Sequence, residues 1–455
     1  MKLWIDKENE MLPVSEWENA YVFTLTREKY STIFTNIADT WYRMDQMEIQ
    51  EIYEDLFVIG ISIFALDKRI NRRLFKDCWT REISVNIPVL NKEAWDATKE
   101  EWNKTLGFLT GDVWDINFRQ SQKQYSKREN PNRVHLNIEK CDCVSLFSGG
   151  LDSYCGAIKL LEDGKSPCLV GHNEYPKLRQ KQQEFVDNFQ SIYEEQVVKF
   201  ISFSANSRAP KTVQGELLPG AENTSRGRSL LFLCAGISIA GILGKEIPVY
   251  IPENGFIGLN IPLTNSRKGT CSTRTTHPYF LNGFQNILKS VGIMNPVINF
   301  FAYSTKREIV NGVKDTKAFN DHYKDTISCS HPCLARYNKK GYNEYPINCG
   351  YCYPCLIRKS SLLDLEDFKY SYEAQTKAFI QQYGETEKAS DLRAVLSAVY
   401  SSRKMNDEDI VRKIQIAGHL SIEEVSAFLR VYKSSMADLE QLFSADDEIK
   451  KLIGD

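Results

Sequence analysis

Six consecutive residues, Ser148-Gly149-Gly150-Leu151-Asp152-Ser153, combine two glycines, two hydroxyl groups and one carboxylate at a turn. The apolar run CVSLF precedes the turn, and a helical pattern over residues 153–162 follows it. Glycine lets the backbone approach phosphate oxygens closely, and the first amides of a helix favour an anion. We therefore predict that the whole turn binds the phosphates of ATP, and that Asp152 holds Mg²⁺ or caps the helix.

This turn differs from two other phosphate-binding motifs. No Gly-Lys-Ser or Gly-Lys-Thr follows it, and its glycines do not have the G-x-G-x-x-G spacing. A short, serine-flanked loop suits a pyrophosphate group that leaves as a unit. The competing interpretation is an ordinary tight turn in an α/β sheet.

A second group suited to chemistry is a cluster of cysteines. Cys349, Cys352 and Cys355 form a C-x2-C-x2-C run, and Cys329 and Cys333 lie upstream of it. Four thiolates from two nearby loops suit a tetrahedral Zn²⁺ ion. An iron–sulfur cluster and packed free thiols are the alternatives. We favour zinc in a structural role, because four thiolates leave no open position on the metal and no redox step is required.

The elements that must position these residues follow from the hydrophobic periodicity. In residues 141–365, short apolar runs alternate with helical patterns. This alternation predicts βαβ units and a parallel sheet, so we expect an α/β catalytic domain here. Ligands of such sheets bind beyond the C-terminal ends of the strands, which is where the glycine turn lies.

The regions on either side differ in pattern. Residues 1–118 are predicted to form an α+β accessory domain in which residues 55–67 and 81–90 are β-rich. A predicted helix over residues 95–109 places on one face Trp95, Trp102, Leu106 and Leu109. This region carries no catalytic constellation, so we interpret it as a scaffold or docking surface.

Two further regions complete the predicted layout. Residues 119–140 are predicted to form a solvated polar linker. Residues 366–455 are predicted to form a helical domain, in which Ser421 and Glu424 have the spacing of a capping box. Apolar residues at helical spacing follow that box, so an amphipathic helix is the expected structure.

Composition limits the class of protein and its partners. The 455 residues are 42% hydrophobic and 25% charged, as in a soluble globular chain of two or three domains. The formal net charge of -2 argues against a large polyanion such as tRNA or duplex DNA. No apolar run is expected to reach the length of a bilayer, and the N-terminus lacks the apolar core of a signal peptide. We therefore expect a cytoplasmic protein without a membrane or strong nucleic-acid surface.

The two motifs together resemble a known family. S-G-G-x-D-S after a strand is the signature of the PP-loop ATP pyrophosphatases. The T-x-S-C segment from Thr326 to Cys329 and the C-G-x-C-x-x-C-x-x-R segment from Cys349 to Arg358 are similar to those of the 7-cyano-7-deazaguanine synthases (QueC). The segment around Arg228 is similar to the R-N-L segment of that family. The resemblance covers roughly residues 141–365.

The resemblance implies a Rossmann-like core of the HUP type that binds ATP, Mg²⁺ and Zn²⁺. It implies that Cys329, rather than Cys333, is the fourth zinc ligand beside Cys349, Cys352 and Cys355. It also implies a substrate, 7-carboxy-7-deazaguanine, whose carboxylate is adenylated by ATP with release of pyrophosphate. Ammonia then attacks to give the amide, and a second round of activation dehydrates the amide to the nitrile.

The whole layout is similar to the QueC-like component of anti-phage defence operons, the Qat system in particular. Related defence proteins imply that the deazaguanine carboxyl is joined to the N-terminal amine of a partner protein from the same operon. Residues 272–280 depart from the G-Y-P-D-C-R-P-E-F segment of the nitrile-forming enzymes. We therefore predict a C–N ligase that forms an amide with a partner amine. A free nitrile synthase that uses ammonia and a non-catalytic nucleotide-binding scaffold are the alternatives.

Individual residues receive candidate roles within this framework. Arg228 joins the glycine turn in the predicted ATP site. Arg274 and Arg358 are candidates for binding the substrate carboxylate or the adenylate, because guanidinium donors match such planar anions. Glu253 and Asn254 follow the fourth predicted strand and are candidates for reading the guanine-like edge of the substrate.

Two histidines are weaker candidates for chemistry. His277 is a candidate general base for the attacking amine, with a structural hydrogen bond as the competing interpretation. His172 follows the second predicted strand and has less support.

Overall fold

The computed structural model describes the whole chain except residues 27, 43, 45–48, 126–135, 223, 225, 262, 264–273, 335–344, 368 and 455. Its central part is a five-stranded sheet in the order β12-β11-β6-β7-β8, and every neighbouring pair is parallel. The strands are β6 (Cys143–Leu146), β7 (Pro167–His172), β8 (Lys199–Phe203), β11 (Val249–Tyr250) and β12 (Val297–Ile298). The predicted parallel α/β arrangement is confirmed.

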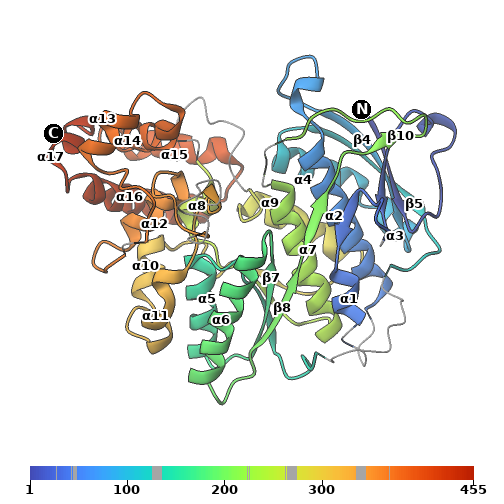
Figure 1. The fold of residues 1–455 in the computed structure, drawn as a ribbon, viewed down its shortest axis with the longest axis horizontal. Helices are drawn as coiled ribbons and strands as arrows, with labels where there is room; N and C mark the ends of the chain where they lie inside the picture. Colours follow the sequence, from blue (N-terminus) through green and yellow to red (C-terminus); the bar gives the residue numbers. More distant parts are fainter. Residues whose placement is uncertain are drawn as a thin grey trace.

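Helices cover both faces of the central sheet (Figure 1). They include α5 (Leu151–Glu162), α6 (Pro176–Ile192), α7 (Arg226–Leu243) and α9 (Pro278–Ser290). Along β7, Cys168 and Val170 join the core formed with α7, whereas Leu169 joins the core formed with α5 and α6. This alternation buries both faces, which explains why the strands read as continuous apolar runs.

The N-terminal region builds a second sheet in the order β5-β4-β1-β2-β3-β9. Its strands are β1 (Lys2–Lys7), β2 (Tyr21–Leu25), β3 (Ile33–Thr35), β4 (Glu82–Val89) and β5 (Val113–Gln120), with β9 (Ala205–Ser207) and β10 (Lys211–Thr212) added antiparallel. Because β9 and β10 follow β8 in the chain, the central region contributes two strands to the N-terminal sheet.

The structure corrects part of the predicted linker over residues 119–140. Arg119 belongs to β5, and its guanidinium stacks 3.9 Å from the ring centroid of Trp4 instead of lying in solvent. Tyr125 is also completely buried. Residues 126–135 of the same prediction lie outside the described residues.

The predicted β-rich run over residues 55–67 is wrong, because these residues form helix α2 (Glu51–Arg69). The helix is buried on nearly all sides, so its sequence lacks the polar stripe that distinguishes a surface helix from a buried strand. It packs on the N-terminal sheet and against α7, and the two helices lie side by side between the sheets (Figure 1). One hydrophobic core therefore runs from the first sheet to the second.

Burial also accounts for the apolar sequence of helix α7. By length and apolarity it reaches the requirement for crossing a membrane, which corrects the expectation that no run comes near it. Within the structure, 78% of this helix is buried, mainly against the central sheet and α2. Its apolar character therefore fits a core helix that is covered on both sides.

The other helices connect and cover these layers. They are α1 (Ile37–Tyr42), α3 (Lys92–Asp96), α4 (Lys99–Thr110), α8 (Gly255–Leu259), α10 (Lys306–Asn311), α11 (Lys317–His322) and α12 (Tyr353–Ser361). The predicted helix over residues 95–109 is present as α3 and α4, broken between Asp96 and Lys99. Its four predicted core residues are completely buried.

The C-terminal region is helical, as predicted, and packs on α8 and α12 (Figure 1). Its helices are α13 (Lys377–Tyr383), α14 (Ser390–Ser402), α15 (Asp407–Ala417), α16 (Ile422–Phe443) and α17 (Asp447–Leu452). The capping box of Ser421 and Glu424 is present at the start of α16. The core of this region also takes in three buried cysteines, Cys349, Cys352 and Cys355.

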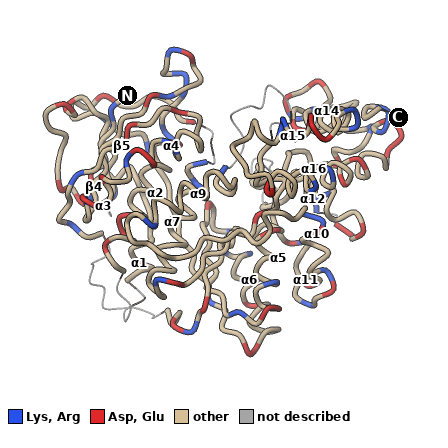
Figure 2. The backbone as a smooth tube through the Cα atoms, turned by 180° about the vertical axis from the view of Figure 1, so that it is seen from behind, with Lys and Arg blue, Asp and Glu red and all other residues tan. Residues whose placement is uncertain are grey.

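Charged residues of both signs are interspersed along the chain (Figure 2). This distribution agrees with the nearly balanced total of 57 basic and 59 acidic residues.

The contact between α2 and α7 gives a test of the fold. A Cβ atom at Gly60 would lie 2.8 Å from both Cβ and Sγ of Cys234, so a larger side chain must push the helices apart. We expect Gly60→Val to lower the free energy of unfolding by about 1–3 kcal/mol, measured by urea denaturation. Gly312→Ala is the control, because Gly312 has a helical φ of -68° and its nearest neighbour would be 3.4 Å away. Equal stability of the two variants would contradict this packing.

Candidate functional site

The glycine turn lies at the point where the strand order of the central sheet reverses. β6 has β7 and β8 on one side and β11 and β12 on the other, so loops after β6 and β11 diverge from neighbouring strand ends. Such reversals form the crevice in which open α/β sheets bind ligands. The turn follows β6, and Glu253 and Asn254 follow β11, so the topology places both groups at this crevice.

The backbone of the turn depends on its glycines. Gly149 has a φ of +82°, which side chains with a Cβ rarely adopt, and Gly150 precedes the first residue of α5. The hydroxyls of Ser148 and Ser153 lie 3.1 Å apart, and the Ser153 hydroxyl donates to the Gly150 carbonyl at 3.0 Å. The two serines therefore fix the shape of the loop that opens the helix.

A distant segment closes the other side of the turn. The Ile327 amide donates to the Gly149 carbonyl at 3.0 Å, and the Leu151 amide donates to the Ser328 hydroxyl at 3.0 Å. A Cβ at Gly150 would lie 3.4 Å from the Ile327 carbonyl oxygen. The turn is thus held between the start of α5 and residues 326–328.

Asp152 is the centre of a cluster of polar side chains beside the turn. Its Oδ2 accepts a hydrogen bond from the Asn254 amide at 2.7 Å, and its Oδ1 lies 2.9 Å from Nζ of Lys306. All three side chains are buried. The carboxyl of Glu253 also shares a hydrogen bond with Asp152. Two acidic groups, one cation and one amide therefore meet at the crevice.

The second carboxyl of this cluster holds its proton unusually tightly. Burial, and then the charge of Asp152, raise the pKa of Glu253 to about 8, while the charge of Lys306 acts in the opposite direction. A like charge this close in a buried site disfavours ionisation of Glu253. The cluster therefore has an exchangeable proton near neutral pH.

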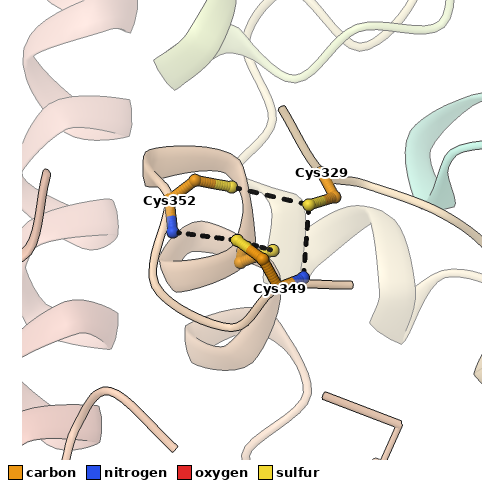
Figure 3. Close-up of side chains that lie close together, drawn as sticks. Cys329, Cys349 and Cys352 are labelled. Carbon is orange, nitrogen blue, oxygen red and sulfur yellow. Dashed lines mark hydrogen bonds between the residues drawn. The ribbon is translucent and has the colours of Figure 1, made fainter. Parts of the chain in front are cut away.

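Four cysteines form a compact group. Figure 3 shows three of them, Cys329, Cys349 and Cys352, close together. Cys349 and Cys352 lie on the loop that leads into α12, Cys355 lies in its first turn, and Cys329 approaches from another segment. All four Sγ atoms lie within 4.8 Å of one another. Cys333, the alternative fourth ligand, is not part of this group.

The geometry of the four sulfurs fits zinc. Sγ of Cys349 lies 3.9 Å from that of Cys355, and Sγ of Cys352 lies 3.9 Å from that of Cys329. A tetrahedron with Zn–S bonds of about 2.3 Å has sulfur–sulfur edges of about 3.8 Å. The amides of Cys349 and His331 each donate to the Cys329 sulfur at 3.2 Å, as expected for a thiolate that carries charge.

The thiol group and the glycine turn are joined by residues 326–329. Cys329 belongs to the thiol group, and the residues just before it bond to the turn. Asn348, the residue before Cys349, supports this segment. Its Oδ1 accepts from the Ser328 amide at 2.9 Å, and its Nδ2 donates to the Thr326 carbonyl at 3.1 Å.

Arg358 lies behind the same segment rather than in the crevice. Its guanidinium is completely buried and donates to the Thr326 hydroxyl at 2.5 Å and to the Tyr323 carbonyl at 2.9 Å. It also forms an ion pair with Asp367 at 3.0 Å. These bonds engage Arg358 with the protein itself, so its position fits a positioning residue for the segment that closes the turn.

Arg274 and His277 lie together just before α9. Their hydrogen-bond partners are Phe108 and Tyr279, which are not part of the Asp152 cluster. Nη1 of Arg274 donates to the Phe108 carbonyl at 3.0 Å. Nδ1 of His277 accepts from the Tyr279 amide at 3.1 Å and caps α9. Burial, and then the charge of Arg274, lower the pKa of His277 to about 4. This histidine is therefore neutral at physiological pH and has the structural hydrogen bond that was the competing interpretation.

The remaining two candidates are His172, the last residue of β7, and Arg228, in the first turn of α7. Arg228 is partly exposed and forms an ion pair with Glu174 at 2.6 Å. His172 is buried against the rings of Phe64 and Phe203, and burial lowers its pKa to about 4. Among the residues that the structure describes, these are contacts away from the glycine turn, so the structure does not bring Arg228 or His172 into the Asp152 cluster.

Sequence reasoning missed Lys306 and Ser328. Lys306 is the first residue of α10, which begins at the same edge of the sheet after β12. Its position in the sequence was the available signal. A lysine that opens a helix after a strand lies at the edge where the parallel strands end, and ligands bind at that edge. Ser328 was noted only as part of the cysteine motif, although its hydroxyl accepts the hydrogen bond from the glycine turn.

Comparison with known proteins adds no assignment. A scan against protein-family models finds no match. A search of curated proteins finds no relative either.

The thiol group predicts one tightly bound Zn²⁺ per chain. Structural zinc sites supply on the order of 10 kcal/mol of binding free energy, so Cys352→Ser should give insoluble or metal-free protein. Cys333→Ser is the matched control and should retain full zinc content by elemental analysis. Iron in the purified protein, or a full complement of zinc in Cys329→Ala, would overturn the assignment.

The raised pKa of Glu253 predicts a pH dependence of stability. The folded protein holds this proton up to about pH 8, whereas an unfolded chain releases it near pH 4.5. The contribution of Glu253 is therefore complete below pH 4.5 and is lost as the pH rises through 8. We expect Glu253→Gln to flatten the fall in melting temperature between pH 6 and pH 8.5. The exposed Glu195→Gln serves as control, and identical slopes for wild type and Glu253→Gln would contradict the prediction.

Proposed function

We propose that this protein is an ATP-dependent, AMP-forming C–N ligase of the 7-cyano-7-deazaguanine synthase type. The observation that carries the proposal is the Asp152 cluster beside the glycine turn, at the strand reversal of a parallel sheet. The four-thiol group joined to that turn supports the same family, because both motifs of the resemblance meet through residues 326–329. On this proposal the central region is a Rossmann-like core of the HUP type.

The glycine turn would hold the phosphates of ATP. The amides of the first turn of α5 lack acceptors within the helix, and the helix dipole favours an anion there. Lys306 adds a positive charge beside Asp152, where charge builds up on the leaving pyrophosphate. Mg²⁺ fits the same place, because Asp152 and Glu253 offer carboxylate oxygens, and it would neutralise phosphate charge when bound.

The proposed reaction has two bond-forming steps. A carboxylate oxygen of 7-carboxy-7-deazaguanine attacks the α-phosphorus of ATP, the bond to the bridging oxygen breaks, and pyrophosphate leaves. An amine nitrogen then attacks the acyl carbon, the acyl–oxygen bond breaks, AMP leaves, and the nitrogen loses a proton. A group with a pKa near the working pH exchanges such a proton efficiently, which suits Glu253.

We assign the attacking amine to a partner protein, in keeping with the proposed place of this chain in anti-phage defence. The N-terminal and C-terminal regions both pack against the start of α9, and a cleft of about 370 Å³ lies between α4, α9 and α16. A bound chain end makes the attack effectively unimolecular and lets it compete with water and dilute ammonia. The flanking regions thus offer the surface that such a partner requires.

The proposal predicts AMP and pyrophosphate as products when the full chain receives ATP and 7-carboxy-7-deazaguanine. Loss of charge stabilisation at the leaving group costs about 10²–10³-fold in rate, so Asp152→Asn, Ser153→Ala and Lys306→Gln should each slow pyrophosphate release accordingly. Asp163→Asn, at the exposed end of the same helix, is the matched control. Release of ADP and phosphate, or unchanged rates in all three variants, would contradict the proposal.

The same reaction mixture identifies the amine when candidate partner proteins are included. Intact mass spectrometry should show a partner heavier by one deazaguanine acyl group. A free nitrile with every candidate partner at its unmodified mass would instead assign the ammonia-dependent synthase reaction.

A further inference from the structure

A buried cluster with excess positive charge lies where α4 ends against the start of α7. It contains Arg72, Arg81, Arg226, Arg274, Asp67 and Asp112. The carbonyl of Thr110, at the end of α4, accepts from Arg72 at 3.0 Å and also from Arg226. The carbonyl of Phe108, two residues earlier in the same helix, accepts from Arg274. Four guanidinium groups thus face two carboxylates.

Both carboxylates are already engaged with other groups. Asp112 forms ion pairs with Arg72 at 2.6 Å and with Arg81 at 2.5 Å. Asp67 pairs with Arg81 at 2.6 Å and accepts from the Thr224 hydroxyl and the Gly227 amide. Arg226 and Arg274 have no ion pair with any residue that the structure describes. The positive charge of these two side chains is therefore left without a partner.

Arg226 has donors that meet no acceptor in the described part of the chain. Its side chain is 3% exposed, and its Nε and Nη2 atoms are buried without a hydrogen-bond acceptor among the described residues. A buried donor of a charged group that lacks an acceptor is strongly unfavourable, and a bound anion is one of the few features that explain such a group in a native protein. The donors that remain open on Arg226 match one edge of a planar or tetrahedral oxyanion.

Arg274 lies close enough to complete the same site. Burial, and then the charge of Arg274, lower the pKa of Arg226 to about 10, so the two guanidinium groups repel each other. Arg274 is only half-buried and its guanidinium lies 5.3 Å from the ring centroid of Phe108. It therefore connects the buried donors of Arg226 with the surface.

The position of this pair relative to the sheet agrees with a ligand site. α7 leads into β11 and α9 leads into β12, so both helices begin at the edge where the parallel strands end. Arg226 is the first residue of α7, and Arg274 lies just before α9. The pair thus occupies the same edge as the glycine turn without sharing a residue with it.

We propose that Arg226 and Arg274 form a binding site for the oxyanion of a small ligand, either a carboxylate or a phosphate group. Two guanidinium groups, one at the start of α7 and one on the segment before α9, clamp one such group, and its negative charge balances the excess arginine charge. The site joins the N-terminal region to the central sheet, because the carbonyls at the end of α4 hold both arginines in place. The proposal does not depend on the ligase reaction proposed above.

The test measures binding to the full chain at constant ionic strength. Isothermal titration with inorganic phosphate, with 7-carboxy-7-deazaguanine and with ATP separates the phosphate and carboxylate sources. Each charged hydrogen bond that is lost weakens binding by about tenfold or more, so Arg226→Gln and Arg274→Gln should both reduce the affinity for at least one probe to that extent. If the two variants lose affinity only for 7-carboxy-7-deazaguanine, the site binds a carboxylate. If they lose affinity for ATP or phosphate, the site binds a phosphate group.

Arg208→Gln is the matched control. Arg208 also stacks on a phenylalanine, 4.3 Å from the ring centroid of Phe34, and donates to a backbone carbonyl, but it lies on the surface of the N-terminal sheet. Its replacement should leave all three affinities unchanged. In anion-free buffer, Arg226→Gln should melt at the same or a higher temperature than wild type, because it removes an unpaired buried charge. Affinities for every probe that are equal in wild type, Arg226→Gln and Arg274→Gln would overturn the proposal, whether or not pyrophosphate is released.

Discussion

The hydrogen bond from the Ile327 amide to the Gly149 carbonyl joins two parts of the chain that would otherwise be independent. One part is the glycine turn, whose backbone conformation requires a glycine at position 149. The other part is the segment that carries Cys329, one of the four clustered cysteines. A single such bond contributes only about 1 kcal/mol net. Its effect is larger here because Ser328, Asn348 and Arg358 fix the same segment through further bonds. Residues 326–329 therefore move as a unit, and a metal held by Cys329 restricts the turn as well.

The two charged clusters at the ligand edge differ in how their charge is balanced. In the Asp152 cluster, the proton that Glu253 retains and the charge of Lys306 offset the repulsion between the two carboxyls. In the arginine cluster, Arg81 and Arg72 form the ion pairs with both aspartates, so Arg226 and Arg274 have no carboxylate partner among the described residues. A buried network in which every member is satisfied adds rigidity, whereas a partly satisfied one marks a place that something else completes. The same reasoning explains why Arg358, which is fully buried but paired with Asp367, fits a positioning role.

The sequence predicts the local features of this protein well and the distant ones poorly. The strand, turn and helix from residue 143 to residue 162 follow from short-range patterns, and so does the choice of Cys349, Cys352 and Cys355. Residues 55–67 were assigned wrongly, because a helix buried on all sides has no polar stripe and its β-branched residues imitate a strand. Lys306 and Arg226 were missed for a different reason. Their importance comes from the partners that the fold brings to them or withholds, and spacing along the chain contains no record of those partners.

The flanking regions are part of the site's construction rather than attachments to it. A Cβ at Gly418, just after α15, would lie 2.5 Å from Cε1 of His277 and 3.0 Å from the Phe108 ring, so the C-terminal helices press directly on the start of α9. Phe108 belongs to α4 of the N-terminal region, and its carbonyl holds Arg274. All three regions therefore meet at the few residues before α9. Because close-packed interiors transmit displacements, a partner that binds either flank is mechanically connected to Arg274 and to the ligand edge. That connection gives the additional regions a physical role at the site, which a separate docking module would lack.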